Sequence, residues 1–175
     1  MAALLTIITS FIVSFGTVVL REKFSSKRDT KARVEAKKNR LLSKLEVLAD
    51  SLSQLPSTLE ELHIARIETM GNGVPSQERL NAIEAKCNGL VVLYFDKDLE
   101  KSWNELAKKC NLACNKSIEF MIANLKLIQC KQPPLQPGSC ESDAFNAARK
   151  EFLLAFKSML REMPNVRRRI EAVQR

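Results

Sequence analysis

The sequence predicts an all-α protein with an N-terminal single transmembrane helix, a basic helical stalk and a four- to five-helix antiparallel bundle. Residues 2–20 carry no charge, whereas Leu, Ala, Lys and Glu recur later in segments longer than ordinary strands. The 175 residues include only five Gly and six Pro, and these separate stretches with helical apolar spacing. We divide the chain into an anchor (1–20), a stalk (21–56), a bundle (57–163) and a basic tail (164–175).

The first twenty residues form the predicted anchor. As a helix, residues 2–20 would span about 28 Å, close to the hydrocarbon thickness of a bilayer. A cleaved signal peptide would begin with basic residues and end at a small-residue cleavage site, but here no basic side chain comes before Arg21. A buried helix of a soluble protein is the other alternative, although such helices seldom lie at a terminus next to a charged run. We therefore interpret residues 1–20 as a transmembrane helix.

Hydroxyl side chains gather on one stripe of this helix at 100° per residue: Thr6, Ser10, Ser14 and Thr17. Small residues let helix backbones approach closely in lipid, and hydroxyls can hydrogen-bond across the interface. The stripe therefore predicts helix association in the membrane. The alternative is that these hydroxyls bond only to carbonyls of their own helix.

The net charge of +8 is concentrated beside the anchor. Residues 21–44 hold ten basic and three acidic residues, a net charge of +7, and the rest of the chain sums to +1. A basic flank retains the following domain in the cytoplasm, so we expect the N-terminus outside. It also attracts anionic headgroups. The residues expected to contact lipid are Arg21, Lys23, Lys27, Arg28, Lys31, Arg33, Lys37, Lys38 and Arg40.

The cysteines are odd in number and unevenly spaced, at positions 87, 110, 114, 130 and 140. This pattern suits reduced thiols in the cytoplasm. Cys110 and Cys114 stand one helical turn apart, but a structural zinc site needs four ligands and His63 is the only histidine. We therefore expect neither a metal nor a cofactor.

The stalk contains a short heptad pattern formed by Leu41, Leu45, Leu48 and Leu52. Its 4-3-4 spacing is that of a coiled-coil seam, but two heptads are few. Two interpretations remain open: self-association of the stalk, or an amphipathic helix that lies on its own bundle. Pro56 is predicted to end this helix, because a residue that precedes proline avoids helical geometry.

Capping residues mark the next two helices. Ser57 and Glu60 have the spacing of a capping box, which predicts a helix from Ser57 to about Met70. Ser76 is expected to cap a third helix from near Gln77. We assign residues 90–95 to this helix, because a single strand would have nothing to pair with.

The last two helices are predicted to be the longest. Asp96 is expected to cap a helix from Asp98 to about Cys130, with acidic residues in its first turn. A proline-rich loop at 131–139 leads to a helix at 142–163. Pro164 is predicted to end that helix, and the arginines of the tail to form a solvated surface.

No catalytic motif accompanies these elements: the sequence lacks Ser-His-Asp, Cys-His, HExxH, P-loop and GxGxxG patterns. We therefore expect no enzyme, but a membrane-anchored adaptor or assembly protein with a protein partner. We also expect a homo-oligomer and contact with anionic lipid, and we do not expect nucleic acid as a partner. Two alternatives stay open: a membrane-permeabilising toxin or defence-type effector whose anchors oligomerise, and a spanin-like envelope or lysis protein with the opposite topology.

Overall fold

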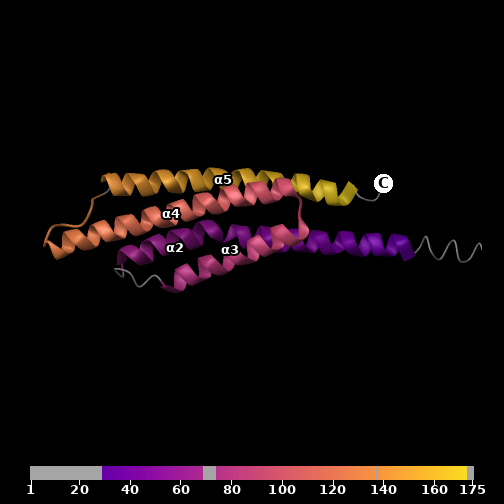
Figure 1. Cartoon of the computed structure of the whole chain (residues 1–175), viewed down its shortest axis with the longest axis horizontal. Helices are drawn as coiled ribbons and strands as arrows, with labels where there is room; N and C mark the ends of the chain where they lie inside the picture. Colours follow the sequence, from indigo (N-terminus) through magenta and orange to yellow (C-terminus); the bar gives the residue numbers. More distant parts are fainter. Residues whose placement is uncertain (1–28, 69–73, 137, 173–175) are drawn as a thin grey trace, which may run out of the picture.

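The computed structural model describes residues 29–68, 74–136 and 138–172, and this part of the chain is all-α (Figure 1). Its helices cover residues 29–53, α2 (Leu55–Glu68), α3 (Val74–Tyr94), α4 (Lys97–Gln129) and α5 (Cys140–Ala172). The prediction of a helical bundle is therefore confirmed. The predicted transmembrane helix at 1–20 lies outside the described residues, and no helix within them is long and apolar enough to cross a bilayer.

The helices lie nearly parallel to one long axis (Figure 1). The most extensive packing joins α4 and α5, whereas α2 packs against both α3 and α4. The helix at 29–53 continues in line with α2, and its N-terminal part extends past the C-terminal end of α5. The first part of this helix therefore has fewer neighbours than the rest of the bundle.

The leucines of the heptad pattern lie in the core of the chain itself. Leu45, Leu48 and Leu52 are buried and Leu41 is half-buried against the same apolar cluster. This arrangement corresponds to the amphipathic helix that lies on its own bundle, the second of the two interpretations. Helices α3, α4 and α5 supply partners for this cluster, among them Val91, Leu106, Phe152 and Met159.

The capping predicted at Ser57 is wrong, because α2 begins earlier. A turn at Gln54 separates the two helices, and the Thr58 amide donates to the Gln54 carbonyl at 3.0 Å. The Ser57 hydroxyl also donates to that carbonyl instead of serving the Glu60 amide. Pro56 is tolerated because first-turn amides have no partner within their own helix. For the same reason α3 includes Pro75, and it begins at Val74 rather than near Gln77.

The helix end predicted at Pro164 is also wrong, since α5 continues through this proline to Ala172. Val166 and Ile170 continue the apolar spacing of Met159 and Met163, and all four side chains are buried. A proline inside a helix costs about 3 kcal/mol, whereas burying one large aliphatic side chain contributes about 1.5 to 3 kcal/mol. Burial of the last two turns therefore offsets the proline, and residues 164–172 belong to the bundle.

Other boundaries agree with the sequence. Helix α4 begins one residue before the predicted start and ends one residue before the predicted end. Its cap is Asp96, whose side chain accepts a hydrogen bond from the Leu99 amide at 3.1 Å. Residues 90–94 are helical and complete α3, so the choice of helix over strand is confirmed for them.

Candidate functional site

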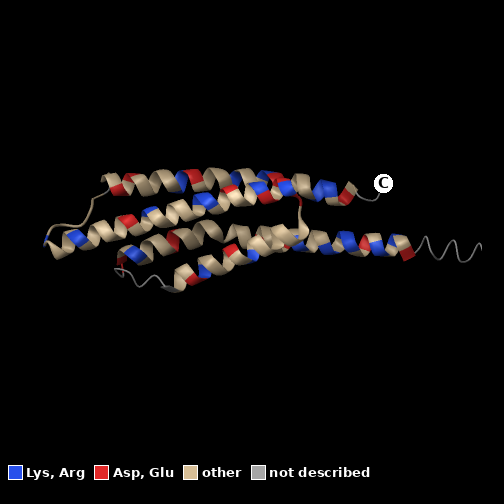
Figure 2. Cartoon of the chain, in the orientation of Figure 1, with Lys and Arg blue, Asp and Glu red and all other residues tan. Residues whose placement is uncertain are grey.

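Lys and Arg residues are frequent along the helices at one end of the bundle, which we call the basic end (Figure 2). It consists of residues 29–44, the last turn of α3 at 92–94, and the end of α5 at 165–171. Of the expected lipid-contact residues, Lys31, Arg33, Lys37 and Arg40 are exposed here, whereas Lys38 is half-buried and lies 4.0 Å from Glu35. Four others, Arg21, Lys23, Lys27 and Arg28, lie outside the described residues.

Tyr94, at the end of α3, contacts the helix at 29–53. The guanidinium carbon of Arg40 lies 5.6 Å from the ring centroid, and Nζ of Lys44 lies 5.4 Å from it. These distances suit cation–π contacts. The two residues before Tyr94 are apolar yet exposed: Val92 by 55 % and Leu93 by 73 %. Exposed aliphatic side chains thus lie beside exposed cations.

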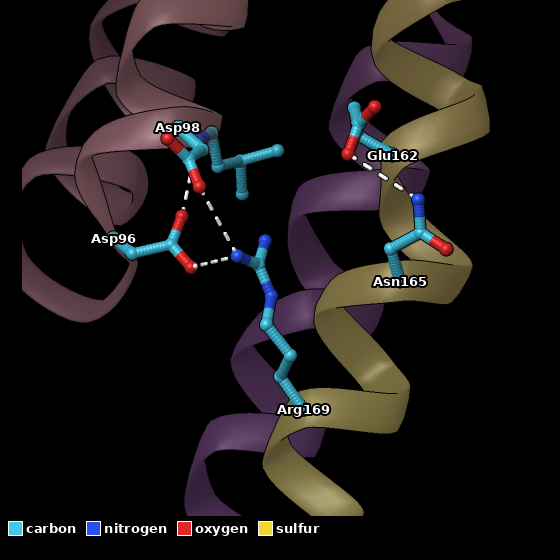
Figure 3. A network of polar contacts seen from close by, with 6 residues as sticks. Asp96, Asp98, Glu162, Asn165 and Arg169 are labelled. Carbon is cyan, nitrogen blue, oxygen red and sulfur yellow. Dashed lines mark hydrogen bonds and ion pairs between the residues drawn. The ribbon is translucent and has the colours of Figure 1, made fainter.

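Arg169 fixes the end of α5 at the same place (Figure 3). Its Nη1 lies 3.0 Å from Oδ2 of Asp96 and 3.3 Å from Oδ2 of Asp98. Asn165, one turn earlier, donates to Glu162 at 3.4 Å. Arg167 and Arg168 flank this contact and stay exposed. The arginines expected to form a solvated tail are therefore part of an ordered helix at the basic end.

The predicted association stripe of Thr6, Ser10, Ser14 and Thr17 lies outside the described residues. The predicted stalk residues Leu41, Leu45, Leu48 and Leu52 lie in the described bundle, where the core covers most of their surface. Of the two predicted association surfaces, only the stalk leucines can therefore be placed in the structure.

A second group of polar residues lies inside the bundle: His63, Arg66, Cys114 and Ser117, which we call the buried polar cluster. Nδ1 of His63 lies 3.0 Å from the Ser117 hydroxyl, and the imidazole stacks on Phe145 with the ring centroids 3.6 Å apart. Burial, followed by the charges of Arg66 and Arg149, lowers the pKa of His63 to about 4. His63 is thus neutral at physiological pH.

Cys114 of this cluster interacts with a second thiol, Cys110. A hydrogen bond between Cys110 and Cys114 lowers the pKa of Cys114 and raises that of Cys110. Burial raises the pKa of Glu84, which also hydrogen-bonds to Cys110. Burial likewise raises the pKa of Cys87 to about 12. Among the described residues, no group of His, Cys, Asp and Glu has an arrangement that could hold a metal ion.

The sequence indicated His63 only as a single histidine without further metal ligands, and the buried polar cluster was not predicted. The spacing of His63 and Arg66 was the available signal for polar residues on a buried face. They are three residues apart, and at helical spacing they share a face with Leu59 and Leu62. Their partners on α4 are Ser117 for His63 and Cys114 for Arg66, 54 and 48 positions away, so no local pattern could reveal them.

The chain has no significant match to a family model, to a curated protein or to a solved structure.

Proposed function

We propose that this chain is a single-pass membrane-anchored adaptor that acts through protein–protein interaction and without catalysis. Residues 1–20 cross the membrane with the N-terminus outside, and the helical bundle lies in the cytoplasm. The observation that carries the proposal is the basic run at 21–44, which directly follows the uncharged segment in sequence and presents exposed cations in its described part, 29–44.

The charge of the basic end suits the anionic cytoplasmic leaflet. A cation near such a surface contributes about 1 kcal/mol, so several exposed Lys and Arg residues would hold this end against the headgroups. Val92 and Leu93 are exposed at the same end of the bundle and would face the membrane, with residues 21–39 of the chain between them and the anchor. The opposite end of the bundle then points into the cytoplasm, where a protein partner can reach it.

The proposed homo-oligomer rests on the anchor. Thr6, Ser10, Ser14 and Thr17 would pack against the same stripe of a second copy in the membrane. The leucines of the stalk contribute little to association between copies, because the core of their own chain buries them. Each copy would therefore present a complete bundle to its partner.

Thiol labelling in intact cells tests this orientation with the full chain. Cys130 and Cys140 are exposed, whereas Cys87, Cys110 and Cys114 are buried. We expect a membrane-impermeant maleimide to leave the chain unlabelled until the membrane is opened, and the chain to remain with the membrane after carbonate extraction. The double variant Cys130→Ser, Cys140→Ser should stay unlabelled throughout. Labelling from outside would contradict the topology, and release by carbonate would contradict the anchor.

A further inference from the structure

A pocket of about 230 Å³ lies between the end of α2, the C-terminal half of α4 and the loop that follows α4. Its walls are mostly apolar: Ile67, Phe120, Met121, Leu125, Ile128, Pro134 and Leu135. The two polar residues of the lining are Arg66 and Asn124. Oδ1 of Asn124 already accepts from the Leu135 amide at 2.7 Å, so its Nδ2 group is the part that could still donate to a ligand.

Arg66 is the unusual member of this lining, because only 7 % of it is exposed. Its Nη1 donates to the Cys114 carbonyl at 2.9 Å and its Nη2 to Oε1 of Gln77 at 2.5 Å. Both acceptors are neutral. No ion pair joins Arg66 to a carboxylate within the described part of the chain.

A buried cation without an anionic partner is costly, and buried charges in proteins are normally paired. The described residues use only two of the five N–H donors that a guanidinium carries. A carboxylate in the pocket would compensate the charge and accept from the remaining donors. Arg66 therefore points to an anionic ligand.

The rest of the lining limits the kind of molecule that could carry this carboxylate. A peptide would bring backbone amides that need hydrogen-bond partners, and the apolar walls offer almost none. The pocket is also smaller than the range of roughly 300 to 1,000 Å³ that is typical of drug-sized ligands. We propose that this pocket binds a short- to medium-chain fatty acid, with its carboxylate on Arg66 and its alkyl chain along α4. The site does not depend on the proposed membrane anchor.

Octanoate is a suitable probe, with octylamine and octanol as matched ligands of opposite charge and of no charge. The full chain would be reconstituted in phosphatidylcholine nanodiscs and labelled at Cys130, near the pocket, with a trifluoromethyl tag in the Cys140→Ser background. The ¹⁹F shift is then followed as each ligand is added. We expect saturable binding of octanoate, and binding of octanol and octylamine that is at least about tenfold weaker, because charge-assisted hydrogen bonds are lost.

Two variants and one control locate the site. Arg66→Met should weaken octanoate binding by about tenfold or more while binding of octanol changes little. Ile67→Trp, at a position 43 % exposed, should fold normally and obstruct binding of all three ligands. Arg79→Met removes the same charge from an exposed position on α3 and should leave binding unchanged.

Circular dichroism verifies that each variant is folded. Equal binding of octanoate and octylamine, or octanoate binding that survives in Arg66→Met, would overturn the proposal. So would the absence of any octanoate binding to the wild-type chain, which would leave an apolar segment of another protein as the occupant to test.

Discussion

The two ends of the bundle are held together in different ways. At the basic end the contacts are exposed ion pairs and cation–π contacts, such as Arg169 with Asp96 and Arg40 with Tyr94. Around the buried polar cluster, aromatic and polar side chains pack in the interior, as His63 does against Phe145 and Ser117. Exposed ion pairs contribute at most about 1 kcal/mol, whereas a buried aromatic residue contributes several times more. The contacts of the buried polar cluster should therefore contribute more to stability than the exposed contacts of the basic end.

The largest effect is expected from Phe145→Ala. This side chain is 3 % exposed and covers His63, so its removal should lower the free energy of unfolding by about 3 to 5 kcal/mol. Leu93→Ala at the basic end is the matched control, because Leu93 is 73 % exposed and should change stability by less than about 0.5 kcal/mol. Denaturation of both variants, followed by circular dichroism, makes the comparison. Equal losses would contradict the assignment of stability to the buried polar cluster.

The second effect is a dependence of the free energy of unfolding on pH that originates at His63. The pKa of this side chain falls from its ordinary value of 6.5, which applies to the unfolded chain, to about 4 in the folded chain. Between these values the unfolded chain binds a proton that the folded chain does not. The stability present above pH 6.5 should therefore fall as the pH drops towards 4. Because solvent screens the half-buried ring, the expected loss is about 2 kcal/mol.

His63→Gln is the control for this prediction, since glutamine does not titrate. Between pH 7.5 and pH 4, the free energy of unfolding should change less for the variant than for the wild-type chain. If both proteins lose the same stability over this range, the pH dependence comes from other groups.

The smallest effect is expected at Asp96, which both caps α4 and pairs with Arg169. Asp96→Ala removes both contacts and should cost about 1 to 2 kcal/mol. Asp96→Asn retains a capping oxygen and loses the ion pair, so it should cost less than about 1 kcal/mol. Thermal unfolding of the two variants separates the contributions. An Asn variant as unstable as the Ala variant would mean that the ion pair, rather than the cap, stabilises this end.

Local signals in the sequence predicted the helices well. The carboxylate of Asp96, three residues before the Leu99 amide, is enough to begin α4, and the apolar spacing of α4 is continuous. Pro164 misled the prediction because its cost is local, whereas the burial of Val166 and Ile170 that offsets it depends on other helices. Ser57 misled it because the preceding helix supplies the carbonyl that the start of α2 uses.

The functional surfaces were likewise predictable only where the signal is local in the sequence. A count of charges along the chain located the basic residues at 21–44. The same count could not show that α5 returns to this end, or that Leu93 lies exposed beside Arg40 and Tyr94. The pocket at Arg66 joins residues from α2, α4 and a loop, and only the fold brings them together.

The central claim is that the basic end faces the membrane, and the distance of a fluorescent label from the membrane surface tests it most directly. A nitrobenzoxadiazole label is placed at Leu93→Cys in the Cys130→Ser, Cys140→Ser background, or at Cys140 in the Cys130→Ser chain. Each full-length protein is reconstituted into vesicles that contain a trace of rhodamine-labelled phosphatidylethanolamine, which quenches the label by energy transfer more strongly the closer the label lies to the membrane surface. We predict strong quenching at position 93 and little at position 140, which begins α5 at the far end of the bundle. Equal quenching at both positions, or quenching at 140 alone, would contradict the proposed orientation.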